Sequence, residues 1–208
     1  MDRRKRLSHI KMNFAGLDLG QVRDHSAMVI VERGAGDGPY YVRYVERVRL
    51  GTPYPQVVEW VRRIGAQPEM QGRSALAVDA TGVGAPVVEM LRAARLGCTL
   101  TPVTITSGER EHETGGMWHV PKKDLLAGVQ VLLEQGRLRV PRGMAETGAL
   151  VKELVDVQIS HRRGGGVRIG ADGTGQHDDL VIALALAIWR AGKAMTRYGE
   201  SNKRALFG

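Results

Sequence analysis

Three groups of acidic residues are the features of this 208-residue sequence that could carry chemistry. Asp18 lies in Gly-Leu-Asp-Leu-Gly at the end of an apolar run, and Asp79 ends a second apolar run, Ala-Leu-Ala-Val-Asp. The third group, Asp178 and Asp179 after His177, precedes a long apolar stretch. A carboxylate at the tip of a buried strand is costly unless it is paired or binds a cation.

Taken singly, each acid has an ordinary structural explanation. An Asp before a Gly-rich turn is usually a turn former, and an Asp at a helix start is usually an N-cap. Taken together, three or four carboxylates on separate elements of one sheet would repel one another unless a divalent cation neutralised them. Oxygen-only ligands suit Mg²⁺ or Mn²⁺, and two such ions about 4 Å apart can promote hydrolysis of a phosphodiester. We therefore predict a metal site.

Hydrophobic periodicity predicts the elements that would position these acids. Three strands are expected at 13–20, 26–32 and 41–50, and their short connections favour antiparallel hairpins. Helices and strands then alternate, with helices at 57–64, 87–94, 125–133 and 180–188 and strands at 74–78, 98–105 and 138–140. Residues 150–155 suggest a helix, although the run that follows could pair as a hairpin across 162–166. The predicted fold class is a mixed α/β sheet flanked by helices.

The domain organisation predicted from composition is simple. A basic leader at 1–12 and a polar tail at 196–208 are expected to be flexible, on either side of one domain at 13–195. The hydrophobic fraction of 43% is enough for a sizeable core. No apolar run approaches the roughly 20 residues that span a bilayer, and one cysteine cannot form an intramolecular disulfide. A soluble protein in a reducing compartment, with no membrane partner, is expected.

The charge balance favours polyanionic partners, nucleic acid above all. Thirty Lys and Arg against 22 Asp and Glu give a formal charge of +8. Candidate DNA contacts are Lys122 and Lys123 at a helix start, and Arg162 and Arg163 beside three glycines. Solvated helix lysines and an ordinary hairpin turn are the alternatives.

The remaining aromatic and histidine residues give weaker signals. The histidines at 112 and 119 flank two glycines in what is predicted to be an exposed loop. The three tryptophans, at 60, 118 and 189, are too far apart in sequence to indicate a base-stacking platform.

The segments that carry the acids resemble the nuclease domain of the large terminase subunit of tailed bacteriophages. The resemblance covers about residues 13–192, and its most specific part is the His-Asp-Asp that opens the last helix. It rests on three segments of the sequence. These are residues 16–20 with Asp24 six positions after Asp18, residues 78–84, and residues 175–180 with the apolar helix that follows. It implies a ribonuclease H-like fold and an Mg²⁺- or Mn²⁺-dependent endonuclease that cuts concatemeric viral DNA at the start and end of genome packaging.

Carried over by motif, the resemblance also implies roles for single residues. Asp18, Asp79 and Asp178 would be the catalytic metal ligands, Asp179 would support or share them as a further ligand, and Asp24 would support the site. His177 could orient an acid or contact phosphate, and a plain helix-start residue is the alternative. The implied partners are double-stranded DNA, an ATPase motor domain, a portal protein and a small terminase subunit, in the cytoplasm of a bacterial host.

The sequence departs from the family in one feature, and two other functions are alternatives to the terminase nuclease. The ATPase domain that normally precedes the nuclease needs a Gly-x-x-x-x-Gly-Lys-Ser/Thr loop, which this sequence lacks. We therefore expect either an excised nuclease domain or a protein that carries the nuclease alone. A Holliday-junction resolvase would share the fold and the chemistry, and a non-catalytic DNA-binding module would use the acids only structurally.

Overall fold

A computed structural model describes residues 11–20, 24–33, 38–82, 84–162 and 178–207. The described strands are β1 (Met12–Asp18), β2 (Ala27–Arg33), β3 (Tyr40–Arg47), β4 (Ser74–Asp79), β5 (Thr99–Thr106), β6 (His112–Thr114), β7 (Met117–Pro121) and β8 (Leu138–Arg139). The described helices are α2 (Tyr54–Gly65), α3 (Gly84–Ala93), α4 (Lys122–Glu134), α5 (Thr147–Arg162) and α6 (Asp179–Phe207). Within these residues no helix is both long and apolar enough to cross a membrane.

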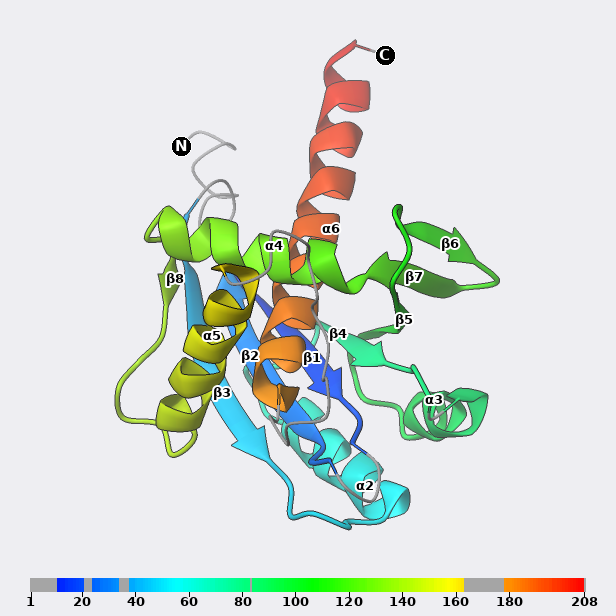
Figure 1. Cartoon of the computed structure of the whole chain (residues 1–208). Coiled ribbons are helices and arrows are strands. Elements are labelled where there is room, and N and C mark those ends of the chain that lie inside the picture. Colours follow the sequence, from blue (N-terminus) through cyan, green and yellow to red (C-terminus); the bar gives the residue numbers. More distant parts are fainter. Residues whose placement is uncertain (1–10, 21–23, 34–37, 83, 163–177, 208) are drawn as a thin grey trace.

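The strands form one mixed sheet in the order β6-β7-β5-β4-β1-β2-β3-β8. β1, β2 and β3 pair antiparallel, whereas β4 lies parallel to β1, β5 to β4 and β7 to β5. Helices α4, α5 and α6 cover one face and α2 and α3 lie on the other (Figure 1). This confirms the predicted mixed α/β sheet of three antiparallel strands followed by parallel strands.

Strand alternation divides the core between the two faces of the sheet. Ala15 and Leu17 of β1 pack with α2 and α3, and Phe14 packs with α4 and α6. Since successive side chains point to opposite faces, Gly16 and Asp18 share the α6 face with Phe14. In β4, Ala75 and Ala77 likewise belong to the α6 side of the core. Both strands therefore present small residues beneath α6, Gly16 in β1 and Ala75 and Ala77 in β4, and an acid at the end.

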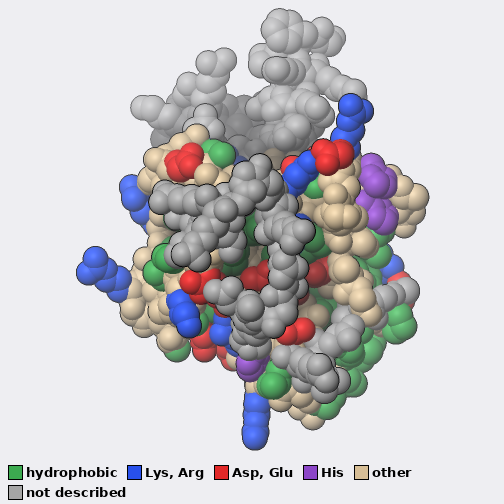
Figure 2. All heavy atoms as spheres, viewed as in Figure 1, with side chains coloured by type: hydrophobic (Ala, Val, Ile, Leu, Met, Phe, Trp, Pro, Cys, Tyr) green, Lys and Arg blue, Asp and Glu red, His purple; other side chains and the backbone are tan. Residues whose placement is uncertain are grey.

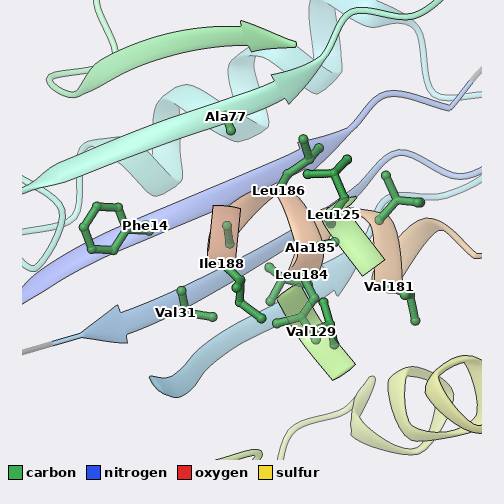
Figure 3. Close-up of a cluster of buried hydrophobic side chains, with 14 of the residues drawn as sticks. Phe14, Val31, Ala77, Leu125, Val129, Val181, Leu184, Ala185, Leu186 and Ile188 are labelled. Carbon is green, nitrogen blue, oxygen red and sulfur yellow. The ribbon is translucent and has the colours of Figure 1, made fainter. Parts of the chain in front are cut away.

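Helix α6 is buried on all sides over its first three turns. Every residue from Leu180 to Ile188 is buried, as expected for a helix that is apolar all round. Figure 3 shows α6 between the strands and α4, with Ile188 near Val31 of the sheet and Leu184 beside Val129 of α4. The helix is thus the central element of this half of the core.

The contact between α6 and β1 requires glycine at position 16. A Cβ built there would lie 1.9 Å from the carbonyl oxygen of Ala183 and 2.7 Å from the backbone nitrogen of Ala187. Both neighbours are backbone atoms of a buried helix, so they cannot move aside as a side chain could. The first glycine of Gly-Leu-Asp-Leu-Gly therefore sets how closely α6 approaches the sheet.

Several expectations are corrected or extended. The segment predicted as a loop around 112–119 is the β6–β7 hairpin, which lengthens the sheet at its edge. The alternative hairpin after residue 155 is wrong as far as 162, because α5 continues to that residue; 163–166 lie outside the described residues. Helix α6 continues to Phe207, so the segment expected to be a polar tail is helical to that residue, and its flexibility stays a prediction. Of the predicted basic leader, only residues 11 and 12 are described.

We expect Gly16→Ala to destabilise the protein strongly, because its methyl group would collide with the α6 backbone. The loss should reach the upper end of the range of about 1–3 kcal/mol typical of overpacked cores. Thermal unfolding followed by circular dichroism measures it. Gly38→Ala is the matched control, because a Cβ at Gly38 meets nothing within 4 Å. Equal melting temperatures for the two variants would contradict the close-packing argument.

Candidate active site

Four carboxylates gather where β1 and β4 end and α6 begins. Leu17 of β1 is in register with Val78 of β4, so Asp18 and Asp79 follow at the carboxyl ends of adjacent parallel strands. Asp178 precedes α6 and Asp179 is its first residue. Figure 2 shows acidic side chains gathered near the middle of the face seen in Figure 1, with Lys and Arg side chains around them. The structure therefore brings together the four acids that the sequence singled out.

The turn after β4 holds Asp79 in place. One of its carboxylate oxygens accepts a hydrogen bond of 2.8 Å from the backbone N–H of Thr81. The Thr81 hydroxyl in turn accepts a hydrogen bond of 2.7 Å from the backbone N–H of Ile105 in β5. Asp79 is thus a turn former, as an Asp before glycine often is. Its turn is tied to the neighbouring strand, which fixes the position of the acid.

Burial and mutual repulsion disfavour the charged forms of the strand-end acids. Burial raises the pKa of Asp18 well above its usual range, and Asp79, Asp179 and Asp178 raise it further, while Lys122 opposes them. Burial also raises the pKa of Asp79, against hydrogen bonds from Thr81 and the charge of Lys122 that lower it. The carboxylates on the two strands and at the helix start therefore share one electrostatic environment.

Lys122 lies inside this acid cluster. Its ammonium group is 2.7 Å from a carboxylate oxygen of Asp178, and it is the first residue of α4. The sequence placed Lys122 among candidate DNA contacts, whereas the structure gives it an acid partner at the site. Its neighbour Lys123 instead bonds to the exposed carboxylate of Glu109.

Two charged residues that the sequence analysis missed lie beside the start of α6. One carboxylate oxygen of Glu153 in α5 accepts the backbone N–H groups of Leu180 and Val181, both at 3.0 Å. Arg47, the last residue of β3, forms an ion pair with Glu153, and its Nε lies 3.9 Å from a carboxylate oxygen of Asp179. No local pattern marks either residue, since they lie 106 positions apart in strand and helix segments of ordinary composition.

The remaining predicted site residues are not brought into this cluster. Asp24 is exposed in the connection between β1 and β2. His177 and Arg163 lie outside the described residues, and Arg162 ends α5 with a side chain that is not described. Their roles stay predictions.

The fold also joins aromatic residues that appeared unrelated in the sequence. Trp118 of β7 and Trp189 of α6 meet edge to face with ring centroids 5.5 Å apart, and the Lys193 ammonium lies 4.6 Å from the Trp118 ring centroid. On the hairpin, His112 and His119 stack with centroids 4.7 Å apart. Trp118 and Trp189 are therefore neighbours in the fold although they lie far apart in the sequence.

The donor chemistry of the acid cluster fits a hard divalent cation. In the part of the chain that the structure describes, no three His, Cys, Asp or Glu side chains lie close enough to form a ready-made metal site. Among the described residues the charges are nevertheless unbalanced, because four carboxylates share the cations of Lys122 and Arg47, and Arg47 also pairs with Glu153. A cation with a preference for oxygen ligands would relieve that repulsion.

We expect Asp18→Asn to raise the melting temperature of the metal-free protein at neutral pH. The pKa of Asp18 is higher in the folded protein than in the unfolded chain. The stability linked to the protonated carboxyl group is therefore fully present below the unfolded pKa of about 3.9, and it is lost as pH rises through the folded pKa. Each kcal/mol of relieved repulsion corresponds to about 2–4 °C. The measurement is thermal unfolding in EDTA at several pH values.

The gain for Asp18→Asn should shrink toward acid pH. Glu59→Gln, which alters an exposed acid paired with Arg62 on α2, should show no such gain. A difference between Asp18→Asn and wild type that is the same at every pH would refute the electrostatic explanation.

Comparisons with known proteins agree with this architecture. The family model described as Terminase RNaseH-like domain matches residues 15–190. The large terminase nuclease of the thermophilic phage G20c is similar in structure, with a TM-score of 0.56, 23% identity, and coverage of 85% of this chain and 81% of that one. A comparison with curated protein sequences gives no significant match.

Two further solved structures show the same likeness. The Mn-bound large terminase nuclease domain of bacteriophage SPP1 has a TM-score of 0.51 and 12% identity, covering 90% of each chain. The bacteriophage HK97 large terminase has a TM-score of 0.51 and 17% identity, covering 87% of this chain and 40% of that one. At these identities the likenesses concern the fold, which is ribonuclease H-like as expected. Because the family model spans most of its length, this chain belongs to the terminase ribonuclease H-like domain family.

Proposed function

We propose that this protein is a divalent-metal-dependent endonuclease that cuts double-stranded viral DNA during genome packaging. The observation that carries the proposal is the gathering of Asp18, Asp79, Asp178 and Asp179 at one end of a ribonuclease H-like sheet. Membership of the terminase family supports DNA as the substrate. The Mn bound to the SPP1 nuclease domain supports a divalent cofactor.

The four acids would hold the cations, with Mg²⁺ or Mn²⁺ as the candidates and two ions as the expected number. When bound, the ions would supply positive charge that activates a water molecule and stabilises the leaving oxygen of the phosphodiester. Within the protein, Asp79 is held by its turn and Asp178 by Lys122. The burial that disfavours charge on Asp18 gives this position a strong preference for a nearby cation.

Lys122 has a second proposed role beside the acids. Its ammonium group is partly exposed while it contacts Asp178. A lysine in this position can balance the carboxylates in the metal-free protein and contact a scissile phosphate when DNA is bound. Positive charge near the phosphate would add to the stabilisation of the transition state.

DNA would be bound mainly through its phosphates. The formal charge of +8 favours a polyanion, and phosphate contacts carry no sequence information. Lys123, Arg162 and Arg163 remain the proposed backbone contacts. An ATPase motor domain, a portal protein and a small terminase subunit are the proposed partners, in the host cytoplasm. The match to only 40% of the HK97 large terminase is consistent with a chain that represents the nuclease part of such an assembly.

The direct test is cleavage of supercoiled plasmid in Mn²⁺, Mg²⁺ or EDTA. We expect cleavage only with metal, and Asp18→Asn and Asp79→Asn should each reduce its rate by more than about 100-fold. This exceeds the roughly 10–100-fold cost of losing a residue that only supports a metal ligand. Glu59→Gln on α2 is the control and should cut like the wild type.

Two outcomes would change the conclusion. A folded wild-type protein that cuts neither plasmid nor a four-way junction with either metal would refute the nuclease proposal. A strong preference for the four-way junction over linear duplex would instead support a resolvase-like enzyme.

A further inference from the structure

We propose that Arg47 and Glu153 are positioning residues that hold Asp178 and Asp179 in the metal site. This inference rests on the proposed nuclease function. In this proposal neither residue binds the metal or DNA itself. Their effect would pass through the first turn of α6, which they contact from a strand and from a neighbouring helix.

Glu153 anchors the helix start through the backbone. The first N–H groups of an α-helix have no partner within the helix and need an acceptor from elsewhere. In α6 the Glu153 side chain accepts two of them, those of Leu180 and Val181, each at 3.0 Å. Glu153 is only 6% exposed and belongs to α5. A residue remote in sequence therefore caps the helix, although the adjacent Asp178 and Asp179 are of a type that often caps.

With Glu153 accepting these N–H groups, both aspartates contribute to the acid cluster. Asp178 carries an ion pair with Lys122, and both aspartates act electrostatically on Asp18. If either had to cap α6, its carboxylate would turn back toward the helix N–H groups. The charge of Glu153 also lies at the helix N-terminus, where a negative charge is favourable.

Arg47 connects the cap to the acid cluster. Its guanidinium pairs with Glu153, and its Nε lies 3.9 Å from an oxygen of Asp179. A planar guanidinium can face two carboxylates at once, which an ammonium cannot do with the same geometry. Since Asp179 is 4% exposed, its charge needs a nearby cation, and Arg47 supplies one from the protein itself.

The register of the sheet places the Arg47 side chain on the face that α6 covers. Ala27 of β2 pairs with Asp18 on one side and with Arg47 on the other. Side chains of directly opposed residues point to the same face, so Arg47 and Asp18 both face α6 across about 10 Å of sheet. Asp179, the first residue of α6, acts electrostatically on Asp18, and one of its carboxylate oxygens lies 3.9 Å from Arg47 Nε. This is the arrangement expected of a residue that orients a metal ligand without binding the metal.

The test compares Glu153→Gln and Arg47→Lys with a matched control, Glu32→Gln. Glu32 also pairs with two cations, Lys11 and Arg43, but on β2 and away from α6. Two quantities are measured: the Mn²⁺ concentration for half-maximal plasmid cleavage, and the rise in melting temperature that Mn²⁺ causes. The second does not depend on cleavage.

We expect Glu153→Gln to raise the required Mn²⁺ concentration by about 10–100-fold and to reduce the Mn²⁺-induced stabilisation. Arg47→Lys keeps the positive charge, so it should shift the Mn²⁺ requirement in the same direction by a smaller factor. Glu32→Gln should leave both quantities unchanged. If Glu153→Gln does not fold, Arg47→Lys against Glu32→Gln decides the question.

A purely structural ion pair would give a different result. Lower melting temperatures in EDTA with an unchanged Mn²⁺ requirement would overturn the positioning role. Failure of the proposed function is distinguishable, because it would appear in the wild type as neither cleavage nor stabilisation by Mn²⁺. A wild type that binds Mn²⁺ without cutting would still test the inference through its melting temperature.

Discussion

The close crossing of α6 over β1 at Gly16 is the contact on which the other features of the site depend. The helix backbone approaches so nearly that no side chain fits at this position of the strand. Asp18 follows two residues later on the same face, and Asp179 begins the helix one turn before the crossing. If the helix lay farther from the sheet, the acids from the two elements would not act on each other.

The same packing that defines the site makes it electrostatically unfavourable. Burial against a hydrophobic sheet and helix disfavours the charged form of Asp18, which is partly buried, and neighbouring acids add repulsion. The protein moderates this cost with Lys122 on one side and Arg47 on the other. Local unfavourable charge supported by a rigid scaffold is typical of functional sites. It is also why a bound cation would stabilise the folded protein.

The topology explains why the acids share one edge. β1 and β4 are parallel neighbours at the centre of the sheet, so their carboxyl ends coincide. Open sheets with parallel strands bind ligands at that edge, where the connections diverge. β5 and β7 extend the parallel part, and Lys122 follows β7 directly into the same region. The sheet order thus delivers both the acids and a compensating cation to one place.

Local sequence patterns were sufficient to predict most of the elements and the acids of the site. Strand alternation, helical periodicity and an acid at each strand end are local patterns, because they reflect side-chain direction along a single segment. They were enough to predict the central strands, helix α6 and the gathering of Asp18, Asp79, Asp178 and Asp179. The family resemblance was carried by the same segments.

The residues that surround those acids become apparent only in the folded chain. Arg47 and Glu153 meet because β3 and α5 flank the start of α6, and neither segment encodes that neighbour. Lys122 faces Asp178, and Trp118 meets Trp189, across similarly large separations. Such contacts depend on strand register and on how closely a helix crosses a sheet. These are properties of the packed chain, which no single segment specifies.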